Sequence, residues 1–269
     1  MKRALHLLIS MLLLSTASTA TADSTKQRGD SAYVASASGQ FGIVNLETGA
    51  FTQFGTTPLL SGLARGLRHT IYGLDPDNNL IRLNPATGAT AIVGSTGLAP
   101  AGENVTLLTS LENGKLFAVD SNNILYAVNP RTGAATLIGS TGIPVPDFGT
   151  CNCVTGNGLA GAEDELIFVW EVAVDNPGLP PGTVTPSALY RIDPHTGAAH
   201  RIGATRASAP IVGLGFIDDT LYGFTFGPAV GAPNSILKIS RTTGHATFVT
   251  NQDLALDPVF GAIPVRTED

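Results

Sequence analysis

The sequence has little charge, few aromatic residues and almost no cysteine. Charged residues make up 13% and aromatic residues 6% of the 269 residues. Only two cysteines are present, Cys151 and Cys153, so a disulfide framework does not hold the fold together, and a domain of this length buries enough apolar surface to fold without one. The formal net charge is −6 and no basic run stands out, so neither nucleic acid nor an anionic membrane surface is an expected partner.

Motifs of common enzyme classes are also missing. The sequence contains no nucleophile elbow, no HExxH zinc motif, no P-loop and no EF-hand spacing. The histidines do not cluster along the chain, and there is a single tryptophan. Composition therefore favours a protein of strands and turns, rich in Gly, Ala and Thr, over a helical one, and predicts no catalytic residue.

The one long apolar run stands at the N-terminus. Lys2 and Arg3 precede an apolar segment over 4–14, and Ala20-Thr21-Ala22 has the small-x-small pattern of a cleavage site. This run is too short to span a bilayer. We therefore expect a signal peptide over 1–22 and a single domain over 23–269, secreted or periplasmic, without a membrane span. Its partner would be an unknown extracytoplasmic ligand or protein.

An internal repeat accounts for much of the glycine. The same turn recurs as NLETG at 45–49, NPATG at 84–88, NPRTG at 129–133, DPHTG at 193–197 and SRTTG at 240–244. The repeated glycines are 39, 45, 64 and 47 residues apart, a spacing typical of propeller blades. Asn, Asp or Ser at the first position can accept hydrogen bonds from the turn, and the final Gly is expected to be left-handed and to close a hairpin.

Strands are expected on both sides of each turn. A further strand precedes each hairpin, at 32–36, 70–75, 115–120, 165–170 and 220–225. A strand of small residues precedes most of these, at 61–66, 105–110, 156–161 and 211–216. Four strands in each of five units predict an all-β, five-bladed propeller. The first unit lacks a leading strand, while 259–265 has no unit after it. We therefore expect 259–265 to pair beside 32–36 and close the ring.

The amino-acid sequence of the repeat resembles that of known propellers. The segment ALYRIDPHTGAAHRIG at 188–203 is similar to the Leu-Tyr-x-Ile-Asp-Pro-x-Thr-Gly repeats of secreted bacterial propellers, which sit with the quinoprotein-dehydrogenase-like and YVTN-like superfamily and are mostly uncharacterised. The resemblance covers nearly all of 23–269 and implies the fold, not a function. The repeated Trp residues of quinone-dependent enzymes are absent, which disfavours a redox role.

Loop lengths differ between the two faces of such a propeller. With the strands of a blade lettered A to D in chain order, the A–B and C–D turns lie at one face and the B–C and D–A loops at the other. The long segments 140–157, 171–187 and 226–234 all belong to the second face, where we expect any ligand site, near the channel mouth. Such insertions are also cheap to tolerate without function. The first face, with five short turns, is expected to have little concavity.

Candidate ligand-binding residues follow from this choice of face: Asp75, Asp120, Trp170, Glu171, Asp175 and Phe226. Carboxylates at a channel mouth could bind Ca²⁺ or supply acid–base chemistry, although Asp at a strand end more often caps a turn. Trp170 beside Glu171 would suit stacking on a sugar, or Trp170 could pack in the core between blades.

The two cysteines leave three alternatives. Cys151 and Cys153 could form a small disulfide in an oxidising compartment, remain free thiols or, as the least favoured alternative, form half of a metal site. No histidine lies near them in sequence to complete such a site, so no metal is expected there.

Two functions remain after these exclusions. The favoured one is an exported, non-catalytic propeller that binds a ligand or a protein, or acts as a scaffold, without a cofactor. The alternative is an extracytoplasmic carbohydrate hydrolase or lyase with acidic residues at the channel mouth.

Overall fold

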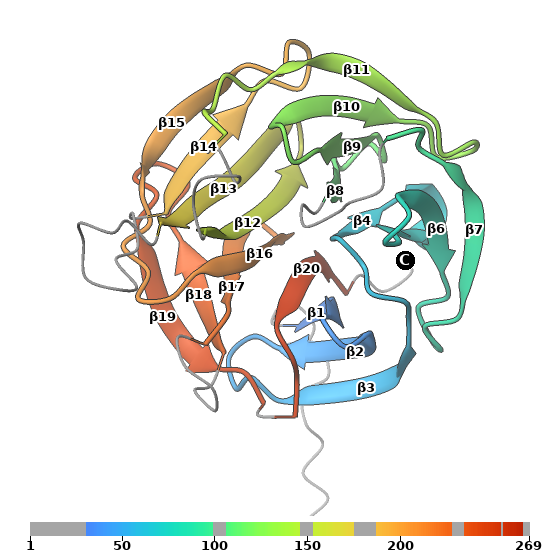
Figure 1. Cartoon of the computed structure of the whole chain (residues 1–269). Coiled ribbons are helices and arrows are strands. Elements are labelled where there is room, and N and C mark those ends of the chain that lie inside the picture. The colour runs from blue at the N-terminus through green and yellow to red at the C-terminus, as the bar shows by residue number, and fades with distance from the viewer. Residues whose placement is uncertain are drawn as a thin grey trace, which may run out of the picture.

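The chain folds as a ring of five four-stranded antiparallel sheets around a central channel (Figure 1). This computed structural model describes residues 31–98, 106–145, 153–174, 187–227, 234–253 and 255–265; the side chains of His69, 153–156 and 171–174 are not described. The expected all-β, five-bladed propeller with four strands per blade is confirmed. The predicted signal peptide lies outside the described residues.

Each blade runs from an inner strand A to an outer strand D. Blade 1 holds β20 (Val259–Pro264), β1 (Ser31–Ser36), β2 (Gln40–Asn45) and β3 (Phe51–Thr56); blade 2 holds β4 (Leu63–Arg65), β5 (Ile71–Leu74), β6 (Asn79–Leu83) and β7 (Thr90–Ser95). Blade 3 holds β8 (Leu107–Ser110), β9 (Leu116–Val119), β10 (Ile124–Val128) and β11 (Ala135–Ser140). Blade 4 holds β12 (Cys153–Ala162), β13 (Glu165–Val174), β14 (Ala188–Ile192) and β15 (Ala199–Ala204), and blade 5 holds β16 (Ile211–Ile217), β17 (Thr220–Thr225), β18 (Ser235–Ile239) and β19 (Ala246–Asn251).

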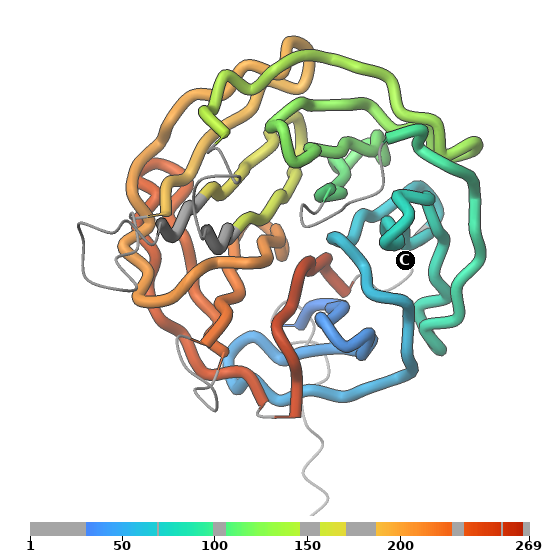
Figure 2. The backbone as a smooth tube through the Cα atoms, in the orientation of Figure 1, coloured from blue at the N-terminus to red at the C-terminus, as the bar shows by residue number. Residues whose placement is uncertain are grey.

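The C-terminal strand closes the ring, as expected. β20 pairs antiparallel with β1, with Ala32 opposite Pro264 and Val34 opposite Ala262. In Figure 2 the red end of the chain lies beside its blue beginning, inside the same blade. Val259 is fully buried, whereas Phe260 is only partly buried. A strand from the far end of the sequence thus completes the first blade and leaves it no open inner edge.

Apolar side chains pack between blades. Five buried clusters are found, and each joins two neighbouring blades: 1 with 5, 3 with 4, 4 with 5, 1 with 2, and 2 with 3. In the first of these, Val34 and Val44 of blade 1 pack with Phe224 and Ile236 of blade 5. Since every blade shares its core with both neighbours, removing one blade would expose two of these clusters.

The repeated Thr-Gly turns explain a second repeated glycine. Gly88, Gly133 and Gly197 have φ of 70°, 83° and 82°, which confirms the expected left-handed turn position. A Cβ placed on Gly94 in β7 would lie 2.2 Å from the carbonyl oxygen of Thr132, in the turn of the next blade. Gly139 is packed in the same way on Thr196. Glycine in strand D therefore lets the next blade's turn approach its backbone.

Candidate functional site

The inner strands converge at one end of the channel and enclose a cavity there. β4, β8, β12, β16 and β20 all run toward the A–B turns, so their C-terminal residues meet at this end. All five blades contribute to the cavity, through Arg65, Glu112, Ala162, Asp218 and Ile263 among others. Its volume is about 50 Å³. Because A–B and C–D turns share a face, the cavity opens at the face of short turns.

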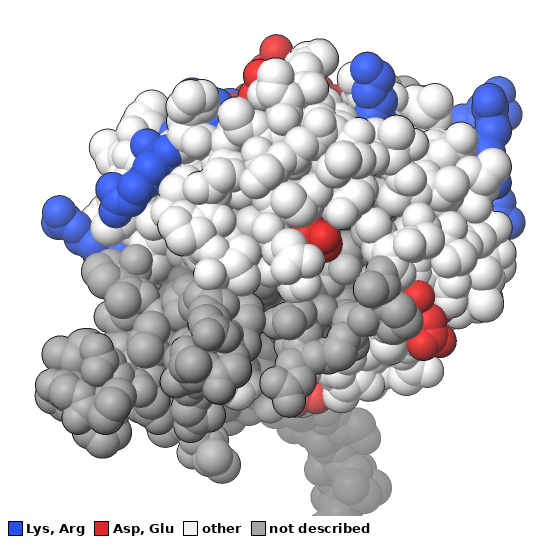
Figure 3. Space-filling model, turned by 45° about the horizontal axis from the view of Figure 1, so that its top comes forward, with Lys and Arg blue, Asp and Glu red and all other residues white. Residues whose placement is uncertain are grey.

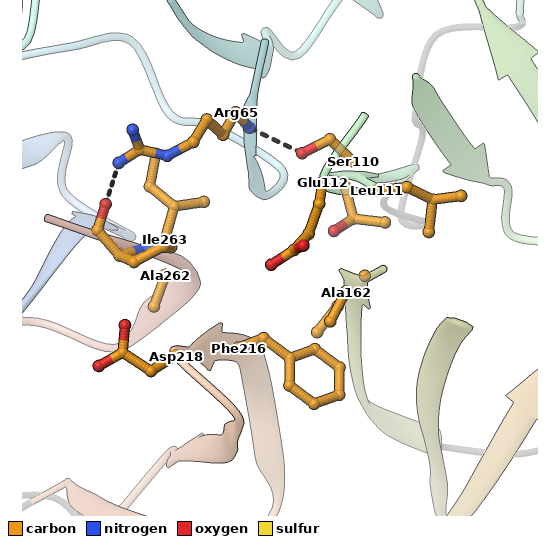
Figure 4. Close-up of a pocket in the computed structure, with 13 residues that line it drawn as sticks. Arg65, Ser110, Leu111, Glu112, Ala162, Phe216, Asp218, Ala262 and Ile263 are labelled. Carbon is orange, nitrogen blue, oxygen red and sulfur yellow. Dashed lines mark hydrogen bonds between the residues drawn. The ribbon is translucent and has the colours of Figure 1, made fainter. Parts of the chain in front are cut away.

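Charged groups of both signs border this cavity (Figure 4). The side chains of Glu112 and Asp218 come from the A–B turns of blades 3 and 5 and lie on different sides of its centre. Both residues are exposed. Arg65, at the end of β4, lines another part of the cavity wall. The cavity is therefore bordered by two carboxylates and one guanidinium, at the end that opens on this face.

Hydrogen bonds hold Arg65 in place between three blades. Its backbone N–H donates to Oγ of Ser110 at 2.9 Å, which links β4 to β8. Its guanidinium Nη2 donates to the carbonyl oxygen of Pro264, which links β4 to β20. Ser110 is 8% exposed, so its hydroxyl is fixed in a mostly buried position. The guanidinium at the cavity wall is thus positioned by β8 and by β20, the strand that closes the ring.

The turns that carry the acids are tight. Ile217 pairs with Thr220, so Asp218 and Asp219 form the whole connection between β16 and β17. Asp218 has φ of 50°, in the left-handed region that Asp tolerates better than most residues. In blade 3 the corresponding turn contains Glu112 and ends at Gly114, with φ of 76°. Short turns therefore fix the backbone position of each acid at the cavity end of the inner strands.

An ion-pair network supports the same end of blades 4 and 5. Glu165 accepts from Nε of Arg191 at 2.7 Å and from Nη2 of Arg241 at 2.6 Å. The Arg241 guanidinium also lies 5.2 Å from the ring centre of Phe216, which lines the cavity. Burial raises the pKa of Glu165, but the hydrogen bonds and charges of the two arginines outweigh it and hold this pKa below the ordinary value of 4.5.

Asp75 and Asp120, which the sequence singled out, cap their own turns. Oδ1 of Asp75 accepts from the backbone N–H of Asp77 at 3.0 Å and of Asn79 at 2.8 Å. Oδ1 of Asp120 accepts in the same way from Asn122 and Ile124, and its Oδ2 accepts from the hydroxyl of Tyr126. Burial, and then the charge and hydrogen bond of Asp120, raise the pKa of Tyr126. Both carboxylates thus have a structural role at the B–C face.

Trp170 is 8% exposed and packs in the cluster between blades 3 and 4, where it stacks on Phe168 with ring centres 5.8 Å apart. Phe226 is 51% exposed, at the end of β17. The Glu171 side chain, Asp175, Cys151 and the Cys153 side chain lie outside the described residues. Of the four candidates that the structure describes, Asp75 and Asp120 cap their own turns, Trp170 packs in the core and Phe226 is exposed, and the role of all six candidates in binding remains a prediction.

The cavity overturns one expectation about the two faces. The face of short turns is not without concavity, because the inner strands, not the loops, form its hollow. Sequence reasoning missed Arg65, Glu112 and Asp218 because each is the polar residue at the end of one inner strand, and nothing in a single repeat marks it. The signal available was positional: Arg65 lies near the end of the small-residue strand 61–66, and Glu112 and Asp218 each stand two residues after the strands 105–110 and 211–216.

The described residues contain neither a membrane-spanning helix nor a metal-binding cluster of side chains. No described helix is long and apolar enough to cross a membrane. In the same part of the chain, no group of three or more His, Cys, Asp and Glu side chains is arranged to hold a metal ion.

Comparison with known proteins assigns no family and no function to this chain. No family model and no curated protein matches the sequence. Among solved structures, the chain is similar to a protein of unknown function from Bacteroides thetaiotaomicron, with a TM-score of 0.47 and 15% identity. The match covers 74% of this chain and 54% of that protein, so this chain spans about half of its length. The sheet topology of this chain makes it a five-bladed β-propeller.

Proposed function

We propose that this protein is an exported, non-catalytic propeller that binds the polar end of a small ligand or partner in the cavity at its A–B face. The observation that carries the proposal is the convergence of Arg65, Glu112 and Asp218, from three blades, on one cavity. Because the group bound would meet charges of both signs, it should carry several hydrogen-bonding atoms or both charges, as an amino sugar or an amino acid does.

The size of the cavity limits what enters it. Its 50 Å³ is room for a few water molecules, since one water needs roughly 10–15 Å³ by the same measure. A whole drug-sized ligand needs a pocket of several hundred Å³ (on the order of 300–1,000). The cavity therefore suits an end group, with the rest of the ligand lying outside on the face of short turns.

The proposal also includes export from the cytoplasm and membership of a propeller family. The basic start, apolar run and small-x-small site over 1–22 support secretion, and the Thr-Gly repeats support a place among the secreted bacterial propellers with Leu-Tyr-x-Ile-Asp-Pro-x-Thr-Gly repeats. N-terminal sequencing of material secreted by the native host should give a chain starting at Asp23. An intact Met1 in that material would contradict export by cleavage.

The binding proposal is tested by thermal shift and calorimetry with a panel of amino sugars, uronic acids and amino acids. At least one should raise the melting temperature of the wild type. The double variant Glu112→Gln, Asp218→Asn should lose that response. The control is Glu47→Gln, an exposed acid in the C–D turn of blade 1 that does not line the cavity. Binding that survives in the double variant would place the ligand elsewhere.

The carbohydrate hydrolase is a second candidate, because one observation favours it. Two carboxylates, Glu112 and Asp218, border the same cavity, and glycoside hydrolysis uses a pair of carboxylates. Release of reducing sugar from a polysaccharide panel measures it. Turnover by the wild type that either single variant abolishes would replace the binding proposal with the enzyme.

A further inference from the structure

A second concave region lies on the rim, between blades 4 and 5. It is an open groove of about 710 Å³ lined by Arg201, Gly203 and Ala204 of β15, by Arg206 just after it, and by Thr243 and His245 of the next blade's C–D turn. Arg201, Arg206 and His245 are all exposed. This groove shares no lining residue with the central cavity.

The repeat itself shows that the groove is unusual. At the position of Arg201, three of the other four blades carry a large apolar residue, Ile92, Leu137 or Phe248, and β3 carries Gln53. At the position of His245, just after the Thr-Gly pair, the other four blades carry alanine: Ala50, Ala89, Ala134 and Ala198. The chain thus replaces repeat-typical apolar residues by an arginine and a histidine in one inter-blade groove.

Arg206 departs from the repeat at a cost. It follows Ala204-Thr205, where blades 2 and 3 have Ser-Thr-Gly with Gly97 and Gly142. Those glycines have φ of 75° and 71°, and Arg206 has φ of 54°. A non-glycine residue in this region costs about 1 kcal/mol or more, and such strain clusters at functional sites. Three departures from the repeat, one of them strained, therefore meet in a single groove.

The charge of the groove is not neutralised by described neighbours. No ion pair involves Arg201 or Arg206 within the part of the chain that the structure describes. Nearby Arg191 and Arg241 differ, because both are bound to Glu165. Two guanidinium groups are thus left to act on a ligand, in a protein whose formal net charge is −6.

We propose that this groove binds an acidic polysaccharide, whose carboxylate or sulfate groups are held by Arg201 and Arg206, with His245 and Thr243 as further hydrogen-bonding groups. Guanidinium groups bind planar oxyanions with two parallel hydrogen bonds. The volume of the groove, about 710 Å³, is larger than one small anion needs, so a chain of sugar units fits it better than a free ion.

Other polyanions fit less well. The groove lining contains no Phe, Tyr or Trp, and the single imidazole of His245 gives no series of rings on which successive bases could stack. On the face shown in Figure 3, the basic side chains stand apart near the outline of the molecule and form no continuous patch of the kind that nucleic acid binding uses. An acidic peptide would need apolar anchor pockets, and the lining offers no large apolar side chain.

The test uses the full chain and immobilised heparin, polygalacturonate and dextran, with a DNA oligonucleotide in parallel. The variant is Arg201→Ile, Arg206→Gly, His245→Ala, which restores residues typical of the other blades and relaxes the left-handed position, so it should fold. Arg82→Ala, an exposed arginine of β6 outside the groove, is the matched control. Wild type and Arg82→Ala should bind the acidic polysaccharides, and the triple variant should bind roughly tenfold or more weakly.

Each other result overturns the proposal. Wild type that binds neither heparin nor polygalacturonate, or binds dextran equally well, has no site for acidic carbohydrate. Equal losses in Arg82→Ala and the triple variant would indicate general charge attraction. Tighter binding of the oligonucleotide would replace polysaccharide by nucleic acid. The double variant Glu112→Gln, Asp218→Asn should bind as the wild type, so this test does not depend on the central cavity.

Discussion

The two faces of the propeller differ in how they would form a site. The face of B–C and D–A connections has the long loops, and parts of them, 146–152, 175–186 and 228–233, lie outside the described residues. The face of A–B and C–D turns has only short connections, yet it contains the central cavity. Loop length and concavity are therefore separate properties: loops add surface, whereas the convergence of inner strands creates a hollow with positioned charges.

The largest expected loss of stability comes from opening the ring, which also disturbs the cavity. Deletion of everything after Leu256 removes β20, with Val259, Ala262 and Ile263 at 0%, 3% and 6% exposure. It also removes Pro264, which holds Arg65 at the cavity. We expect a loss of at least about 5 kcal/mol, comparable to the whole stability of many domains. Urea unfolding measures it, with deletion of 266–269 alone as the control; a stable, cooperative truncated protein would contradict closure by β20.

Two glycines with the same backbone conformation compare the faces directly. Gly133 is in a C–D turn with φ of 83°, and an added Cβ would lie 2.3 Å from the carbonyl oxygen of Gly94. Gly142 follows β11 at the other face with φ of 71° and has nothing within 4 Å. Gly133→Ala should therefore cost about 2–4 kcal/mol, from strain and collision, and Gly142→Ala about 1 kcal/mol, from strain alone. Equal losses in denaturant unfolding would show that the turns do not pack tightly on the neighbouring blade.

A smaller effect is expected at the ion-pair network of the cavity face. Glu165→Gln should destabilise the protein by about 1–2 kcal/mol at neutral pH, because two arginines lose their shared carboxylate while both stay partly in solvent. The folded pKa of Glu165 lies below 4.5, so its ionised form stabilises the fold above that pH, and this contribution is lost as the pH falls through the folded value. The difference between wild type and variant should thus shrink in acid; a constant difference from pH 7 to 3 would rule out this linkage.

The smallest effect is expected from the acids at the cavity itself. Glu112→Gln and Asp218→Asn should each change stability by less than about 0.5 kcal/mol, because both side chains are exposed. A loss of ligand binding in these variants can then be read as a loss of contacts. A much larger destabilisation would show that the acids hold the ring together and are not available for binding.

Much of the fold could be predicted from the repeat, because turn chemistry is local. The Thr-Gly turns and their left-handed glycines can be recognised from the five residues that form each turn. The strand at 259–265 can be recognised from its own apolar residues and from the lack of a unit after it. The site could not be predicted in the same way. Arg65, Ser110 and Glu112 are brought together by blade packing across the channel, a contact between repeats that the pattern inside one repeat does not encode. The length of one inner strand also differs from the expectation. In blade 4 this strand covers Cys153–Ala162, whereas the sequence predicted 156–161.

The most direct test of the account is hydrogen–deuterium exchange with any small ligand that the thermal-shift panel identifies. Binding at the central cavity should slow exchange at the ends of the inner strands and their A–B turns, over 109–114, 160–166 and 216–220. The loops at 141–145 and 226–227 should exchange as in the free protein. Protection confined to the long-loop face, with unchanged exchange at 109–114 and 216–220, would contradict the assignment of the site to the cavity.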